Sequence, residues 1–112
     1  MAPSELRKAT LRELRAARKA MLSARWALSL EAADEETRAE AARELVRVNH
    51  AIIKLENEQL SEIRDALVEN ENDLIASTES LQKTLENVGQ VKKVLGAVSD
   101  VLGVVGRVVA LL

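Results

Sequence analysis

A seven-residue repeat of apolar side chains runs from Ala39 to Val109 without a break in phase. An α-helix returns to nearly the same side every seven residues, so these side chains would form one stripe along a helix. One stripe cannot cover its own apolar surface, and it needs a second helix, a second subunit or a lipid surface. The sequence therefore indicates a helical protein whose main property is association. The repeat consists of Ala39, Val46, Ile53, Leu60, Leu67, Leu74, Leu81, Val88, Leu95, Leu102 and Val109.

The composition favours an all-α fold. Apolar residues make up 47% of the chain, but there is one Trp and no Phe or Tyr. Ala, Val and Leu together with Glu, Lys and Arg are typical of long helices and coiled coils. We expect one all-helical domain, a helical hairpin in which a short N-terminal helix folds onto a long heptad-bearing helix. Such hairpins would associate as a coiled-coil or helical-bundle oligomer.

Local signals divide the chain into three expected segments. Pro3 and Ser4 begin a basic helix over residues 4–29, and Asp34 is placed to cap the next helix after a turn at residues 30–34. A long acidic helix would cover residues 35–87, and a Val- and Gly-rich association helix would cover residues 88–112. Because the repeat keeps its phase throughout, we expect a continuous or gently interrupted rod of about 115 Å. The alternative is a hairpin at Asn70–Asp73, which gives a compact monomeric three-helix bundle.

The charges are unevenly distributed along the chain. Residues 1–30 hold seven basic and two acidic side chains, whereas residues 31–88 hold six basic and fifteen acidic ones. This asymmetry suggests that the basic helix packs against the acidic middle, within one chain or between subunits.

The repeat predicts a non-enzymatic protein that associates with itself, as a homo-oligomer, or with a helical protein partner. The C-terminal part, where the apolar face is widest, is the expected centre of association. The predicted interface residues are Leu60, Leu67, Leu74, Leu81, Val88, Leu95, Val98, Leu102, Val105 and Val109.

Small residues also recur at helical spacing in the C-terminal segment. Such a series allows another helix to approach closely, as at membrane helix interfaces. Residues 94–112 carry two charges, Asp100 and Arg107. The second hypothesis is therefore a membrane-active protein whose C-terminal amphipathic helix inserts into lipid or lies on it. The close-packing residues would be Gly96, Ser99, Gly103, Gly106 and Ala110.

Three further side chains have possible structural roles. Asn49 and Asn70 fall on a second seven-residue series, and buried Asn in such a seam can fix register and subunit number. The other reading is that both amides face water. Trp26, near the end of the basic helix, is interpreted as a packing anchor against the next helix.

The chemical inventory argues against catalysis. His50 is the one histidine and there is no cysteine, so the chain lacks multi-His or thiolate metal sites, and we expect no metal, cofactor or catalytic residue. The basic N-terminal helix lacks Asn and Gln, the usual adenine readers, so a nucleic acid is a disfavoured partner. No apolar secretory segment follows Met1, which predicts a cytoplasmic protein, with membrane association or signal-less export left open.

Overall fold

The computed structural model describes residues 1–111, which form six α-helices and no strand. The all-helical prediction is confirmed. The helices are α1 (Pro3–Met21), α2 (Ala24–Glu31), α3 (Glu35–Asn57), α4 (Leu60–Glu69), α5 (Glu71–Thr84) and α6 (Val91–Val105).

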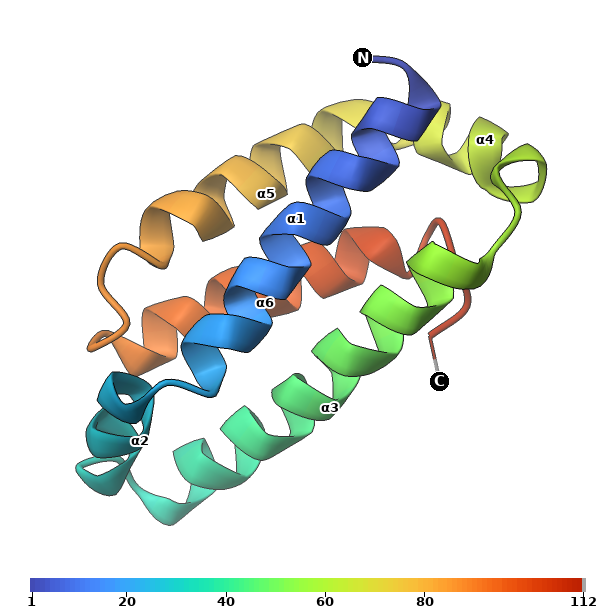
Figure 1. The fold of residues 1–112 in the computed structure, drawn as a ribbon. Coiled ribbons are helices and arrows are strands. Elements are labelled where there is room, and N and C mark those ends of the chain that lie inside the picture. The colour runs from blue at the N-terminus through green and yellow to red at the C-terminus, as the bar shows by residue number, and fades with distance from the viewer. Residues whose placement is uncertain (112) are drawn as a thin grey trace.

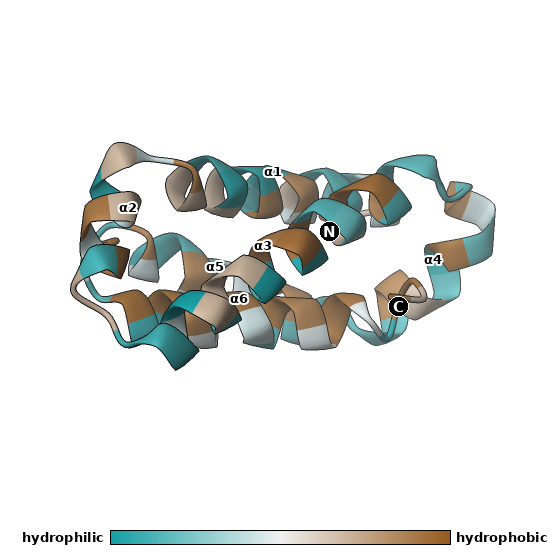
Figure 2. Cartoon of the chain, turned by 90° about the horizontal axis from the view of Figure 1, so that it is seen from below, coloured by the Kyte–Doolittle hydropathy of each residue, from teal (hydrophilic) through white to brown (hydrophobic). Residues whose placement is uncertain are grey.

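The four longest helices pack side by side around one core. Figure 1 shows α1 and α5 running in one direction and α3 and α6 running in the other. The short helices α2 and α4 lie at opposite ends of this bundle (Figure 2). The Cα trace measures 44 × 25 × 18 Å, far from the extended rod that the unbroken repeat predicts. That expectation is wrong, because the chain turns and covers most of its apolar stripe internally.

Within the seven-residue repeat, the first turn follows α3. Glu58 adopts an extended backbone conformation and ends the helix. The guanidinium of Arg7, from α1, donates a hydrogen bond to the carbonyl oxygen of Glu58 at 2.8 Å. A cation that binds a carbonyl oxygen at this end of a helix also interacts favourably with the helix dipole. A contact across 51 residues therefore stabilises an ending that contains neither Gly nor Pro.

Two further interruptions separate α4, α5 and α6. At Asn70 the side-chain amide donates to the carbonyl oxygen of Ala66 at 2.8 Å, and the chain changes direction between α4 and α5. Residues 85–90 form the loop between α5 and α6, where the N–H of Gly89 donates to Asn87 Oδ1 at 3.1 Å. The alternative three-helix bundle is also incorrect in detail. The chain reverses with α4 as a corner rather than through a hairpin at Asn70–Asp73 (Figure 1).

Side-chain caps fix the beginnings of two helices. The expected helix over residues 4–29 is divided at Leu22 and Ser23, and the N–H of Trp26 donates to Ser23 Oγ at 3.2 Å. The predicted cap at Asp34 is confirmed, since its carboxylate accepts from the N–H of Thr37 at 2.7 Å. Hydrogen bonds from Thr37 lower the pKa of Asp34 from its ordinary value of 3.8.

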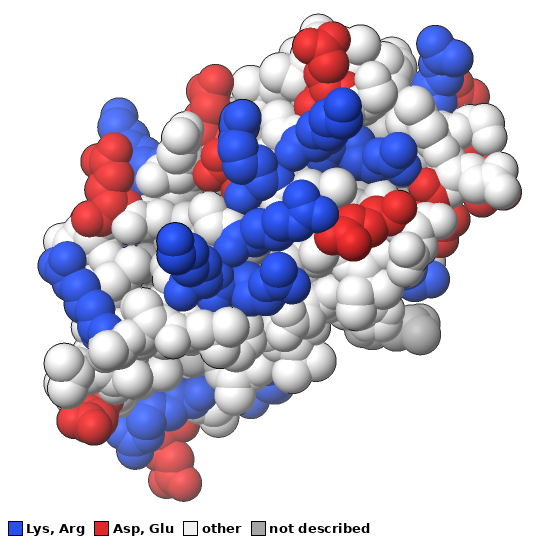
Figure 3. Space-filling model, in the orientation of Figure 1, with Lys and Arg blue, Asp and Glu red and all other residues white. Residues whose placement is uncertain are grey.

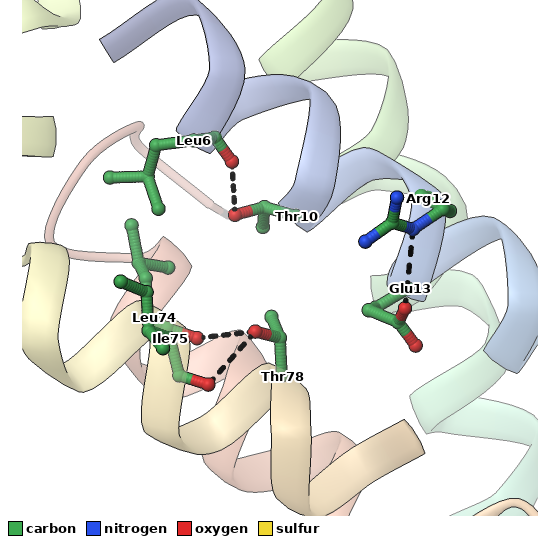
Figure 4. A network of polar contacts seen from close by, with 7 residues as sticks. All are labelled: Leu6, Thr10, Arg12, Glu13, Leu74, Ile75 and Thr78. Atoms are coloured by element: carbon green, nitrogen blue, oxygen red, sulfur yellow. Dashed lines mark hydrogen bonds and ion pairs between the residues drawn. The ribbon is translucent and has the colours of Figure 1, made fainter. Parts of the chain in front are cut away.

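The interface between α1 and α5 contains buried hydroxyl groups. Figure 4 shows Thr10 on α1 and Thr78 on α5, on facing sides of the two helices. Thr10 donates to the carbonyl oxygen of Leu6 at 2.8 Å, and Thr78 donates to that of Leu74 at 2.7 Å. Because each hydroxyl is satisfied within its own helix, the two helices can pack closely without an unpaired donor.

Helix α6 supplies the largest apolar face of the bundle. Nine of its 15 residues are buried, and they belong to the same core cluster as buried residues of the other five helices. None of the helices within residues 1–111 combines the length and the hydropathy needed to cross a bilayer.

Candidate interaction surface

The seven-residue stripe is divided between the core and the surface. Leu67, Leu74 and Leu81 are buried in α4 and α5, and the stripe stays inside the bundle along α6. Its first part, on α3, faces outward instead: Val46 is 67% exposed and Ile53 is 56% exposed. Seven residues apart, these two large side chains lie on one side of α3. The uncovered part of the repeat is therefore on α3 and not at the C-terminal end.

The predicted interface residues contribute to the core of their own chain. Leu60 and Val88 are partly buried and pack against the core, and the other eight are buried. These eight are Leu67, Leu74, Leu81, Leu95, Val98, Leu102, Val105 and Val109. The expected association centre on α6 is thus covered by helices α3 and α5, which form its main contacts.

Helix α1 lies antiparallel beside the exposed side of α3. Arg15 forms an ion pair with Glu56, and Arg18 Nη1 lies 3.5 Å from Asn49 Oδ1. Arg18 lies beside Asn49 and the two helices are antiparallel. Leu22, four residues after Arg18, is therefore placed beside the part of α3 that precedes Asn49. Leu22 is 67% exposed. Three large exposed apolar side chains, Leu22, Val46 and Ile53, therefore lie along the line where α1 and α3 meet.

A row of basic side chains follows the outer side of α1. Figure 3 shows Lys and Arg gathered on this face of the molecule, over α1, with both uncharged surface and acidic side chains beside them. The row has spacings of four, three and four residues, which place its members on one side of the helix. All four are exposed, and we call them the basic ridge: Lys8, Arg12, Arg15 and Lys19. The basic ridge, together with Leu22, Val46 and Ile53, is called the α1–α3 face.

The small residues of α6 lie on its outer surface. Gly96, Ser99 and Gly103 are exposed, as are Gly106 and Ala110 beyond them. Apart from its chain neighbours and the nearby backbone of α6 itself, a Cβ atom added at Gly96 or Gly103 would meet no heavy atom within 4 Å. These glycines therefore do not mediate a close helix contact within residues 1–111.

The other candidate residues from the sequence, two asparagines, the tryptophan and the histidine, are wholly or partly buried within their own chain. Asn49 is half-buried and near Arg18, whereas Asn70 is 9% exposed and bonds within its own chain at the bend after α4. Trp26 is 3% exposed and belongs to the core cluster. His50 is half-buried on α3.

Within residues 1–111, no three His, Cys, Asp or Glu side chains are grouped so as to hold a metal ion. An open cleft of about 510 Å³ lies between the turn before α3 and the start of α6, and Asp34, Lys92 and Lys93 contribute to its lining. Asp34 is the one carboxylate among the residues that line this cleft, and the lining includes no His or Cys.

Sequence reasoning missed Leu22 as a surface residue. It belongs to the basic helix but not to the seven-residue series of Leu14 and Met21, and this difference in phase was the available signal. Comparison with known proteins assigns no family: no family model matches the chain, and no curated protein or solved structure is significantly similar to it.

Proposed function

We propose that this chain is a non-enzymatic helical protein that assembles with copies of itself through the α1–α3 face. The observation that supports the proposal is the exposure of Val46 and Ile53, two members of a repeat whose later members are buried. Single exposed apolar residues are common on protein surfaces. Here Leu22, Val46 and Ile53 lie along the contact between α1 and α3 beside a row of cations, which is an arrangement suited to a second helical surface.

The size of this face limits the strength of the association. Burying a Val, Leu or Ile side chain from full exposure contributes about 1.5–3 kcal/mol. Since Leu22, Val46 and Ile53 are 67%, 67% and 56% exposed, covering all three would contribute about 3–6 kcal/mol. Association itself costs about 4–15 kcal/mol. Apolar burial therefore does not suffice, and we expect weak assembly that also depends on the basic ridge and hence on salt.

Sedimentation velocity from low micromolar to millimolar protein tests the proposal. The average mass of the wild type should rise with concentration, and the rise should be smaller at high salt. Substituting Val46→Ser together with Ile53→Ser should reduce it without lowering the melting temperature appreciably, since both side chains are exposed.

The matched control is Leu28→Ser, because Leu28 is 65% exposed on α2 and lies outside the α1–α3 face. This variant should associate like the wild type. A wild-type protein that keeps the mass of one chain at every concentration would refute the proposal, and so would equal effects of the α3 and Leu28 substitutions.

A further inference from the structure

We propose that the α1–α3 face binds helix α4 of a second copy of this chain in a head-to-tail contact. This inference rests on the proposed function and names the surface that the α1–α3 face would meet. Three features of the two surfaces match and support it. Their charges are opposite, their charged side chains have equal spacing, and on each surface exposed apolar side chains lie beside the charges.

The first match is charge. Helix α1 has six basic and two acidic residues, whereas α4 has three acidic residues and one basic residue. The three carboxylates of α4 are exposed, and we call them the acidic stripe: Glu62, Asp65 and Glu69. In the described chain, none of these carboxylates forms an ion pair, and neither does Lys8 or Lys19 of the basic ridge. These groups are therefore available to charges on another molecule, whereas Arg12 and Arg15 of the ridge also pair with Glu13 and Glu56 within the chain.

The second match is spacing. Arg12, Arg15 and Lys19 lie at positions i, i+3 and i+7 of α1, and the acidic stripe has the same spacing on α4. Each set of three extends along one side of its helix over roughly 10 Å. Equal spacing lets three opposite charges approach three others at the same time, which a random placement of carboxylates would not allow.

The third match is apolar. Val68 of α4 is 57% exposed and lies three residues after Asp65, so the two side chains are neighbours on the helix surface. When the acidic stripe lies over α1, Val68 can lie over α3, where Val46 and Ile53 are uncovered. A nucleic acid backbone would satisfy the basic ridge but would leave these apolar side chains exposed. The combination therefore favours a helical protein surface.

The positions of the two surfaces determine the kind of assembly. The α1–α3 face lies along the side of the bundle, and α4 lies at one end (Figure 1). Each copy carries one of each surface, so the contact joins different surfaces on the two partners. Such heterologous contacts continue into a filament or close into a ring.

Two charge-reversal variants test the inference. The first replaces the ridge by Arg12→Glu, Arg15→Glu and Lys19→Glu. The second replaces the stripe by Glu62→Lys, Asp65→Lys and Glu69→Lys. All six residues are exposed, and circular dichroism should show that each variant retains its helical content and cooperative unfolding. If either reversal disturbs folding, the corresponding Gln or Asn substitutions provide the second pair of variants.

Each variant alone should stay monomeric at concentrations where the wild type associates. An equimolar mixture should recover the wild-type mass, because the reversed ridge of one variant meets the reversed stripe of the other and the two native surfaces also meet. With the neutral variants, each should weaken association at least threefold, and mixing should give partial recovery through the native pair alone.

Control variants with equal net charge separate this contact from general electrostatic effects. Lys83→Glu with Lys92→Glu and Lys93→Glu matches the ridge variant, and Glu31→Lys with Glu40→Lys and Glu86→Lys matches the stripe variant. All six of these residues are exposed and lie outside both surfaces. The control variants should associate like the wild type at moderate salt.

The outcomes distinguish this inference from the proposed function. A wild type that associates through Val46 and Ile53, combined with a mixture of variants that stays monomeric, would overturn the α4 contact and leave the proposed function standing. Association of either variant alone at wild-type strength would also overturn it. A wild type that is monomeric at every concentration would overturn both the α4 contact and the proposed self-assembly. It would favour an acidic helix of another protein as the partner of the α1–α3 face.

Discussion

Leu102→Ala is the substitution that separates an internal core from an interface between subunits. Leu102 belongs to the seven-residue repeat and is 1% exposed within the bundle. Removing such a side chain costs the lost transfer energy and leaves a cavity, about 2–5 kcal/mol in total. In a chain of 112 residues, this loss corresponds to a fall in melting temperature of about 8–20 °C.

The assay is thermal unfolding followed by circular dichroism at several protein concentrations. If Leu102 is buried by its own chain, the loss in melting temperature should be the same at every concentration. If it were buried by another subunit, the difference in melting temperature between wild type and variant would itself change with protein concentration, by mass action. Urea titration provides a second measure of the loss, through the midpoint at an unchanged m value.

Val46→Ala is the matched control, because Val46 belongs to the same repeat but is 67% exposed. Its effect on the free energy of unfolding should stay within about 0.5 kcal/mol. Equal effects of the two substitutions would contradict the burial pattern. A strongly concentration-dependent loss at Leu102 would contradict the conclusion that the chain covers this part of its own stripe.

Two further predictions concern the helices individually. The lowered pKa of Asp34 means that its capping contribution is complete above the ordinary value of 3.8 and is lost as the pH falls through the lowered pKa. Asp34→Asn keeps a capping oxygen but cannot titrate, so the difference in melting temperature between wild type and variant should change in this acidic range. A difference that stays constant with pH would be evidence against the role of Asp34. Gly103→Ala should stabilise α6 by up to about 1 kcal/mol, or about 4 °C, because alanine favours the helix and the added Cβ meets no neighbour. A lower melting temperature would show that a close contact exists at this position.

Part of the fold could be read from the sequence because local chemistry decides it. The capping of α3 by Asp34 depends on residues next to one another, and the all-helical class follows from composition and periodicity. The end of α3 could not be read in this way. Residues 57–59 contain no Gly or Pro, and a hydrogen bond from Arg7, 51 residues away, stabilises the ending.

Along α4, α5 and α6 the seven-residue repeat predicted the buried side of the helix, but along α3 its members Val46 and Ile53 lie on the exposed side. A stripe indicates that a partner helix is needed, but it does not distinguish a helix of the same chain from one of another molecule. Leu95 and Leu102 are covered within the chain, whereas Val46 and Ile53 are not. The α1–α3 face exists because no helix of the same chain covers Val46 and Ile53. Tertiary packing determines which members of the repeat are covered, and the seven-residue spacing alone does not.

The placement of so much apolar surface on α6 has a consequence for biosynthesis. Helices α1 to α5 precede it along the chain, so the nascent protein displays their core-facing side chains before α6 emerges. At about 5–20 residues per second, translation of the 15 residues of α6 takes on the order of one to three seconds. During that interval, binding of a chaperone would compete with aggregation of neighbouring nascent chains.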